Sequence, residues 1–367
     1  MYITYLINGL NGGGAAFPVP DLVRLMESRG HRVKVIALMP QDMKSAARFD
    51  AAGLDWTLIG TGPRDFVGCA RKLLALLRTE KPDLIWTSLT RATLFGQVAG
   101  RLCGIPVVSW QHNAFLKPGN RRLLKLTRPL SAFWVTDSET VADFATDILG
   151  IQRPLINVWP LFRARDDVPQ AQARPANQLF RIGSLGRLHP NKNFCDLIAA
   201  AAELRRQRPE LAARLVIEIG GTGPEQAALQ AQIDSERLDN VKLIGFVERP
   251  ADYLATLHGY VQPSHHEGLC IAAHEAMQAG LAVIATRVGE LQRSVVPGET
   301  GALCEVGDVA AITAAMIALV EDPPRAARMG AASRARVLQR FGIAAFEAAG
   351  AEALARAEKL VAARKPR

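Results

Sequence analysis

Two glutamates stand eight residues apart after an apolar segment that ends at Pro263. If the interval from Glu267 to Glu275 were helical throughout, about 12 Å would separate them along the axis, comparable with the span from a ribose across a diphosphate to an attached sugar. Two acceptors at that separation could serve two clusters of hydroxyl groups. The alternative is that Glu267 only caps the helix and Glu275 lies on a solvated face.

The four residues directly after Glu267 fall at the predicted start of a helix: Gly268, Leu269, Cys270 and Ile271. Backbone N–H groups at a helix N-terminus can bind anions, so these four could hold phosphate or sugar oxygens. Three histidines lie nearby in the sequence, but their order does not give the H-E-x-x-H pattern of a zinc helix. We therefore predict no metal site.

A second candidate group lies in the turn of residues 186–192, between an apolar strand and a helix. It contains Arg187 and Lys192. Arginine offers a directional fork and lysine a mobile point charge, so together they could neutralise a departing diphosphate without a metal ion. Two cations in a loop could also be ordinary surface residues.

A glycine-rich loop, residues 8–14, joins the first predicted strand to a helix whose start is marked by two prolines. Gly13 and Gly14 could present backbone N–H groups to an anion there. The spacing is not G-x-G-x-x-G, and the next strand ends without an acidic residue, so a nicotinamide dinucleotide is not predicted. A simple tight turn is the alternative.

The composition is that of a globular protein with excess positive charge. The 367 residues carry 44 Lys plus Arg against 35 Asp plus Glu, a net charge of +9, and 49% are hydrophobic, which excludes wholesale disorder. The five cysteines are dispersed and form no C-x-x-C pair, which favours a reducing compartment. Residues 1–20 are uncharged but lack the basic start of an export signal, and no apolar run is long enough for a membrane-spanning helix.

Short strands alternate with helical segments in two series, which is the pattern of parallel sheets wound with helices. The predicted strands are residues 2–7, 32–38, 83–88, 106–110, 133–137, 179–185, 214–219, 241–246, 260–263 and 282–285. We predict an α/β protein of two facing Rossmann-like, doubly wound domains, with ligands in an inter-domain cleft at the carboxyl ends of the strands. The N-terminal domain is placed at residues 1–165, a proline-containing linker at 166–177, the C-terminal domain at 178–345, and a C-terminal helix with a basic tail at 346–367.

Residues 117–134 suggest a basic amphipathic helix. Arg121, Lys125 and Arg128 follow at i, i+4 and i+7, with leucines on another stripe, and such a helix suits an anionic membrane surface. The alternative is a half-buried helix of the first domain. The other basic residues are spread along the chain, and the sequence contains no recognised nucleic-acid-binding motif. No nucleic-acid partner is therefore predicted.

Several motifs occur in a characteristic order in the second half of the chain. They are Gly186-Arg187-Leu188 with Lys192, Gly221-x-Gly223-Pro224, Gly245-Phe246-Val247, Pro263-Ser264-x-x-Glu267-Gly268 and Glu275-Ala276-Met277-x-x-Gly280. With them the chain resembles the retaining glycosyltransferases of family 4, which have the GT-B fold and an E-x7-E motif. The resemblance extends over most of the chain.

The resemblance implies that the C-terminal domain binds a nucleotide-diphosphate sugar without a metal cofactor. Arg187 and Lys192 would contact the diphosphate, Glu275 the ribose hydroxyls and Glu267 the donor sugar. The base would rest near Phe246 and Val247. The turn that contains Gly221 and Gly223 would lie near the nucleotide, and the backbone of residues 268–271 would contact the sugar and phosphates.

In the N-terminal domain, Gly13 and Gly14 match the family's glycine loop, and His112 matches a histidine that faces the donor sugar. His112 could instead be a buried core histidine. The chain departs from the family pattern at Ala16, where many members have Glu, and at Glu290 and Arg293, which replace the Gly and Glu of a G-G-x-P-E segment. These departures make it unsafe to transfer the sugar specificity of the commonest relatives.

The expected activity is therefore metal-independent, retaining transfer of a hexose from a UDP- or GDP-sugar. The expected acceptor is a hydroxyl of a lipid-linked saccharide, lipopolysaccharide or exopolysaccharide precursor, at the inner face of the cytoplasmic membrane. Glu267 and His112 would orient the donor sugar, while Arg187, Lys192 and helix amides stabilise the leaving diphosphate. The alternatives are a nucleotide-sugar epimerase of the same fold and a non-catalytic nucleotide-sugar-binding protein.

Overall fold

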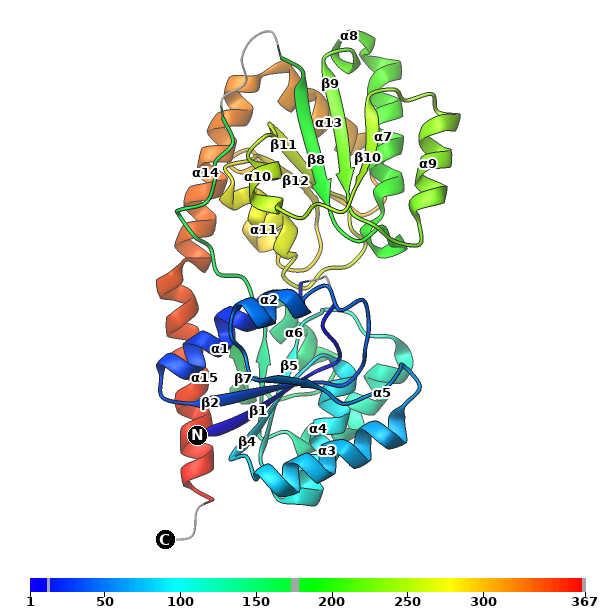
Figure 1. Ribbon diagram of the computed structural model, residues 1–367. Coiled ribbons are helices and arrows are strands. Elements are labelled where there is room, and N and C mark those ends of the chain that lie inside the picture. Colours follow the sequence, from blue (N-terminus) through cyan, green and yellow to red (C-terminus); the bar gives the residue numbers. More distant parts are fainter. Residues whose placement is uncertain (12–13, 173–177, 365–367) are drawn as a thin grey trace. The chain divides into compact units, whose positions relative to one another are not determined.

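The computed structural model describes residues 1–11, 14–172 and 178–364, and the chain divides into two compact units (Figure 1). Unit 1 comprises Met1–Phe162 together with Phe346–Arg367, and unit 2 comprises Arg163–Ala345. Each unit is a parallel sheet with helices on both faces. The two doubly wound sheets predicted from the alternation of strands and helices are thus confirmed.

The sheet of unit 1 has seven strands in the order β3-β2-β1-β4-β5-β6-β7, and every neighbouring pair is parallel. The strands are β1 (Tyr2–Ile7), β2 (Arg32–Ala37), β3 (Trp56–Leu58), β4 (Leu84–Ser88), β5 (Val107–Gln111), β6 (Phe133–Thr136) and β7 (Ile156–Val158). The helices are α1 (Val19–Ser28), α2 (Ala46–Ala51), α3 (Phe66–Glu80), α4 (Thr90–Cys103), α5 (Pro118–Thr127) and α6 (Glu139–Asp147), with most of α15 (Ile343–Ala362).

The sheet of unit 2 has six parallel strands in the order β10-β9-β8-β11-β12-β13. They are β8 (Phe180–Leu185), β9 (Leu215–Gly220), β10 (Val241–Gly245), β11 (Gly259–Gln262), β12 (Val283–Thr286) and β13 (Gly301–Cys304). The helices are α7 (Phe194–Gln207), α8 (Pro209–Ala212), α9 (Gln226–Ser235), α10 (Pro250–Leu254), α11 (Ile271–Gln278), α12 (Leu291–Ser294), α13 (Val309–Glu321) and α14 (Pro323–Phe341).

The core of unit 1 is unusually rich in indole rings. Trp86, Trp110, Trp134 and Trp159 are fully buried, and the rings of Trp110 and Trp159 stack with their centroids 5.0 Å apart. Large aromatic side chains bury much apolar area each. Because the strands are covered on both faces, they read as continuous apolar runs and not as alternating ones.

The last helix returns to unit 1, although the sequence analysis assigns it to neither domain. On α15 the ring of Phe346 lies 5.7 Å from that of Trp159. Gly350 permits close approach, since a Cβ atom there would lie 2.5 Å from Leu25 Cδ2 and 2.7 Å from Trp159 Cζ2. The Arg356 guanidinium donates to Asn157 Oδ1 at 3.0 Å. These contacts explain why the C-terminal segment belongs to the first unit.

All ten predicted strands are present, with each end within one residue of its expected position. The three additional strands, β3, β7 and β13, have only three or four residues each, too few to show a periodic pattern. Among the described residues, no helix has the length and apolar content needed to cross a membrane.

The basic helix is shorter than its charge pattern indicates. It ends at Thr127, and Arg128 begins a 3-10 turn that runs to Leu130. The reason is Pro129, which has no N–H to donate to the carbonyl of Lys125. The side chain of Arg128 donates to that carbonyl instead, at 2.7 Å. Arg121 and Lys125 are exposed, whereas Arg128 is half-buried.

Candidate active site

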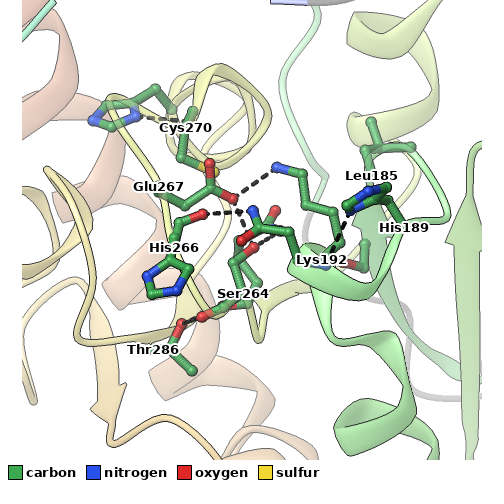
Figure 2. Close-up of polar contacts among 12 residues, drawn as sticks. Leu185, His189, Lys192, Ser264, His266, Glu267, Cys270 and Thr286 are labelled. Carbon is green, nitrogen blue, oxygen red and sulfur yellow. Dashed lines mark hydrogen bonds and ion pairs between the residues drawn. The ribbon is translucent and has the colours of Figure 1, made fainter. Parts of the chain in front are cut away.

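The sheet order of unit 2 reverses between β8 and β11, which lie side by side. In doubly wound sheets, ligands bind outside the carboxyl ends of the strands at such a reversal. The loop after β8 carries Arg187 and Lys192, and the loop after β11 carries Glu267. Residues predicted from two separate motifs therefore meet at one end of the sheet (Figure 2).

Lys192 and Glu267 form a direct ion pair. Lys192 Nζ lies 2.7 Å from Glu267 Oε1, and the two side chains are 20% and 10% exposed. Burial alone would lower the pKa of Lys192, but the neighbouring Glu267 carboxylate reverses this effect, and the pKa is raised above the usual lysine value. The ammonium is thus a permanent positive charge near neutral pH. Its stem passes over Gly186, where a Cβ atom would lie 3.2 Å from Lys192 Cε.

The same carboxylate oxygen has a second donor. Ser264 Oγ donates to Glu267 Oε1 at 2.6 Å, and the Ser264 carbonyl accepts from Thr286 Oγ1 at 2.6 Å (Figure 2). Glu267 does not cap α11, because Cys270 is the N-cap residue. The capping alternative for Glu267 is therefore wrong.

Asn191 joins the two loops of the site. Its backbone carbonyl accepts from the N–H of His265 at 2.9 Å, and its Nδ2 donates to the carbonyl of His266 at 2.8 Å. The sequence analysis names Ser264 only as part of a motif and assigns no role to Asn191, Ser264 or Thr286. Each of them holds the Lys192 or Glu267 loop in place.

The loop between Glu267 and α11 makes a left-handed turn at Cys270, whose φ is +63°. The helix begins only at Ile271, so the interval from Glu267 to Glu275 is not helical throughout and the 12 Å estimate does not apply. Leu269 and Cys270 are buried, and the carbonyl of Gly268 accepts from the N–H of Glu290 at 2.8 Å. The side chain of Cys270 gives the helix no cap hydrogen bond. Glu275 lies half-buried in the second turn of α11.

Gly221 and Gly223 pack backbone against backbone on the loop that carries Arg187. Gly221 has φ +146°, and a Cβ atom there would lie 1.8 Å from the Gly186 carbonyl oxygen. A Cβ atom on Gly223 would lie 2.2 Å from the Leu188 carbonyl oxygen. Only glycine fits at these contacts, so the two residues shape the loop. The Arg187 side chain itself is exposed and makes no hydrogen bond or ion pair with the described residues.

Phe246 and Val247, the expected neighbours of the base, follow the end of β10. Phe246 is 45% exposed, a large value for an aromatic ring. Val247 packs inward, since a Cβ atom on Gly220 would lie 2.9 Å from Val247 Cγ2. Gly220 is the last residue of β9, which lies between β10 and β8 in the sheet. The two residues thus lie beside the strand that leads to the Gly221 turn.

His112 belongs to unit 1, directly after β5, and is buried in a hydrogen-bond network. Its Nδ1 lies 2.9 Å from Asp137 Oδ1, and its Nε2 lies 2.7 Å from Ser88 Oγ. A carboxylate can only accept, so in a neutral imidazole Nδ1 carries the proton and Nε2 accepts from the Ser88 hydroxyl. Trp110 Nε1 also donates to Asp137 Oδ1, at 2.6 Å. Burial raises the pKa of Asp137, against the opposing effect of His112 and these hydrogen bonds.

Sequence reasoning identifies His112 but misses its partners. Ser88 ends β4 and Asp137 follows β6, and these strands flank β5 in the sheet. Polar residues at the carboxyl ends of three consecutive strands are a usable signal, because parallel neighbours end at the same edge. The alternative expectation, a buried histidine, describes the surroundings of His112 correctly.

The glycine loop of unit 1 is only partly described. Gly13 lies outside the described residues, and Gly14 is exposed in a turn. Asn8 Oδ1 accepts from the N–H of Ala92 at 2.8 Å, which ties the loop after β1 to the start of α4. Ala16 is buried, with 3% of its surface exposed.

The departure at Glu290 has a structural partner. Its carboxylate is buried, and Arg340 Nη2 donates to its Oε1 at 2.5 Å. Arg340 Nη1 also donates to the carbonyl of Arg293 at 2.9 Å. The Glu290 N–H also donates to the Gly268 carbonyl. The Glu290–Arg340 ion pair therefore anchors the loop beside Glu267 to α14.

Comparison with known proteins shows which family the chain matches. Residues 167–336 match the family described as Glycosyl transferases group 1, and residues 12–162 match Glycosyltransferase Family 4. Glycogen synthase of Mycobacterium tuberculosis is 30% identical over 90% of this chain and 87% of its own. D-inositol 3-phosphate glycosyltransferase of Thermobispora bispora is 29% identical over 76% and 73%.

Among solved structures, HepE of Anabaena in complex with UDP-glucose has a TM-score of 0.83 at 21% identity, over 97% of this chain and all of that one. The likeness shows the two-domain GT-B fold. The two family matches and the 30% identical relative define a glycosyltransferase. The chain belongs to glycosyltransferase family 4, the glycosyl transferases group 1.

Proposed function

We propose that the protein is a retaining glycosyltransferase that moves a hexose from a UDP- or GDP-sugar to a hydroxyl of a lipid-linked saccharide, lipopolysaccharide or exopolysaccharide precursor. The Lys192–Glu267 pair at the strand reversal of unit 2 carries this proposal. A cation beside a helix N-terminus suits a diphosphate, and a half-buried carboxylate suits sugar hydroxyls. The structure of HepE, whose fold this chain shares, contains UDP-glucose. UDP-sugars are therefore the first donors to test.

The reaction breaks the bond between the sugar C1 and the diphosphate oxygen and forms a bond from C1 to the acceptor oxygen. Arg187, Lys192 and the N–H groups of residues 268–271 stabilise the departing diphosphate, so no metal ion is needed. The acceptor hydroxyl attacks on the face that the diphosphate leaves, and its proton passes to the diphosphate. The anomeric configuration is therefore retained.

The other candidate residues position the donor. Glu275 accepts from the ribose hydroxyls, and the base rests near Phe246 and Val247. Glu267 and His112 orient the sugar and support it electrostatically. His112→Ala should then spare nucleotide binding and slow transfer.

To reach a lipid-linked acceptor, the protein would contact the anionic inner face of the cytoplasmic membrane. On α5, the exposed cations Arg121 and Lys125 lie among the apolar side chains of Leu123 and Leu126, which are 48% and 77% exposed. Mixed cationic and apolar surface suits acidic headgroups. We expect the wild type to co-sediment with phosphatidylglycerol vesicles and not with phosphatidylcholine vesicles. The double variant Arg121→Glu/Lys125→Glu should no longer co-sediment with phosphatidylglycerol vesicles.

A thermal-shift series tests the donor site. The purified protein is heated with UDP, GDP, ADP and their common sugar conjugates in EDTA, because a ligand that binds only the folded state raises the Tm. We expect a shift with one nucleotide and its conjugates. Steady release of that nucleotide during incubation supports transfer or hydrolysis, and the anomeric configuration of the product by NMR tests retention. Transient release would indicate an epimerase, and binding without release would indicate a non-catalytic protein.

A further inference from the structure

Three polar side chains extend from β11 toward Glu267 and are entirely buried. Tyr260, Gln262 and Ser264 are each 0% exposed. They alternate along an extended chain, so they share one face of it. Buried polar groups are costly unless they are hydrogen-bonded, and here each one bonds to the next.

The chemistry of the groups fixes the proton direction in the hydrogen bonds nearest Glu267. The Glu267 carboxylate can only accept, so the Ser264 hydroxyl donates to it, at 2.6 Å. With its proton used, Ser264 Oγ accepts from Gln262 Nε2 at 2.8 Å. Gln262 Oε1 then requires a donor, and the Tyr260 hydroxyl lies 2.9 Å away.

The far end of the chain is fixed by the backbone. The Leu185 N–H donates to the Tyr260 hydroxyl oxygen at 3.0 Å. Burial, reinforced by the carboxylates of Glu275 and Glu267 and opposed by the backbone hydrogen bond from Leu185, raises the pKa of Tyr260 well above its usual value. The phenol therefore stays protonated. Two acceptors lie within reach of its proton: Gln262 Oε1 at 2.9 Å and, at the longer distance of 3.2 Å, the Leu185 carbonyl oxygen. With the Tyr260 proton in the shorter of these two bonds, every donor in the series points toward Glu267.

These hydrogen bonds fix the orientation of the Glu267 carboxylate. Lys192 and Ser264 both bond to Glu267 Oε1, and neither Ser264 nor Gln262 has exposed surface through which water could replace these bonds. A carboxylate fixed before its ligand arrives loses little freedom on binding. The Gln262 amide suits the middle of this hydrogen-bonded series, because it donates from Nε2 and accepts at Oε1, both at fixed positions.

We infer that Gln262 is a positioning residue, which fixes the Glu267 carboxylate through Ser264 for recognition of the donor sugar. The inference rests on the proposed function, in which Glu267 contacts that sugar. Gln262 itself touches no substrate. Its effect should therefore depend on the presence of Glu267.

The test compares four proteins: wild type, Gln262→Leu, Glu267→Ala and the double variant. Their kcat/KM is measured with the nucleotide sugar that wild type turns over fastest among UDP-glucose, UDP-galactose and GDP-mannose. We expect Gln262→Leu to lower kcat/KM about tenfold, equivalent to the net contribution of about one hydrogen bond. Affinity for the free nucleotide diphosphate should change less than about twofold, because that ligand carries no sugar. In the Glu267→Ala background, Gln262→Leu should have almost no further effect.

A matched control and a milder variant separate positioning from folding. Gln97 is also 0% exposed, and its Nε2 donates to Ser131 Oγ at 2.9 Å. Gln97→Leu thus removes a comparable bond in unit 1, and it should leave kcat/KM unchanged. If Gln262→Leu does not fold, Tyr260→Phe removes the donor to Gln262 Oε1 and keeps the ring. It should lower kcat/KM about threefold, again only when Glu267 is present.

The outcomes separate the two claims. A wild-type protein that turns over none of the nucleotide sugars would overturn the proposed function, and the inference with it. Turnover by wild type with unchanged kcat/KM in both Gln262→Leu and Tyr260→Phe would overturn the inference alone. So would losses that multiply in the double variant as if the two residues acted independently.

Discussion

His274 should make unit 2 sensitive to acid. The side chain is fully buried on α11, where its Nδ1 donates to the carbonyl of Cys270 at 2.9 Å and its Nε2 lies 2.8 Å from Ser294 Oγ. Arg340 Nη1 donates to that same Ser294 oxygen at 2.9 Å, so the serine proton is free to bond to Nε2. Protonating Nε2 would break this arrangement and add a buried charge.

The size of the effect follows from the pKa of His274. Burial, together with the Arg340 charge, lowers it from 6.5 to about 4, despite the opposing effects of the Cys270 carbonyl and Glu267. The unfolded chain therefore binds more protons than the folded one between these two values. This contribution to stability is complete above pH 6.5 and is lost as the pH falls toward 4, by about 3 kcal/mol in total.

The assay compares wild type with His274→Gln in urea unfolding at several pH values between 7 and 4. Far-UV circular dichroism follows both units, whereas tryptophan fluorescence follows unit 1 alone, because unit 1 holds all five tryptophans: Trp56, Trp86, Trp110, Trp134 and Trp159. The carboxylates titrate in both proteins and cancel in the difference. We expect wild-type unit 2 to lose about 3 kcal/mol more than the variant over this range. Equal losses, or an NMR titration of His274 near pH 6.5, would refute the reasoning.

Three further variants test other parts of the site. Glu275→Ala should weaken nucleotide diphosphate binding, and equal calorimetric affinity in wild type and variant would contradict the ribose assignment. Gly221→Ala, whose Cβ would lie 1.8 Å from the Gly186 carbonyl oxygen, should displace the Arg187 loop and abolish the thermal shift with nucleotide, whereas Gly245→Ala, with positive φ but nothing within 4 Å, should keep it. Glu290→Ala leaves Arg340 without its carboxylate and should destabilise unit 2 by about 2 kcal/mol in urea unfolding, a loss that Glu290→Met/Arg340→Met should partly restore.

The sequence predicts the two sheets well because parallel strands buried on both faces are continuous apolar runs separated by helices. The same logic locates Lys192 and Glu267, since each follows the end of a strand. What it does not give is the return of α15 to unit 1. That return depends on close contacts such as the one between Gly350 and Trp159, and these join residues nearly two hundred positions apart in the sequence.

The truncated basic helix shows a different kind of failure. The charge spacing of Arg121, Lys125 and Arg128 is correctly helical, but Pro129 ends the hydrogen-bond ladder, and Arg128 turns back to cover the carbonyl of Lys125. A periodic pattern says which face residues would share if the helix continued. A proline decides whether it does continue.

The chain that ends at Glu267 carries a signal that periodicity could have revealed. Tyr260 and Gln262 in β11, and Ser264 two residues beyond its end, place three buried polar groups at every second position, where apolar residues are expected. Each such group must find a partner or destabilise the sheet, so a polar stripe on a central strand implies a bonded series that ends at an acceptor. Glu267, three residues past Ser264, is an acceptor able to end it. Polar residues on a buried strand are thus more informative about the site than polar residues in a loop, because a loop accommodates polar residues without requiring partners.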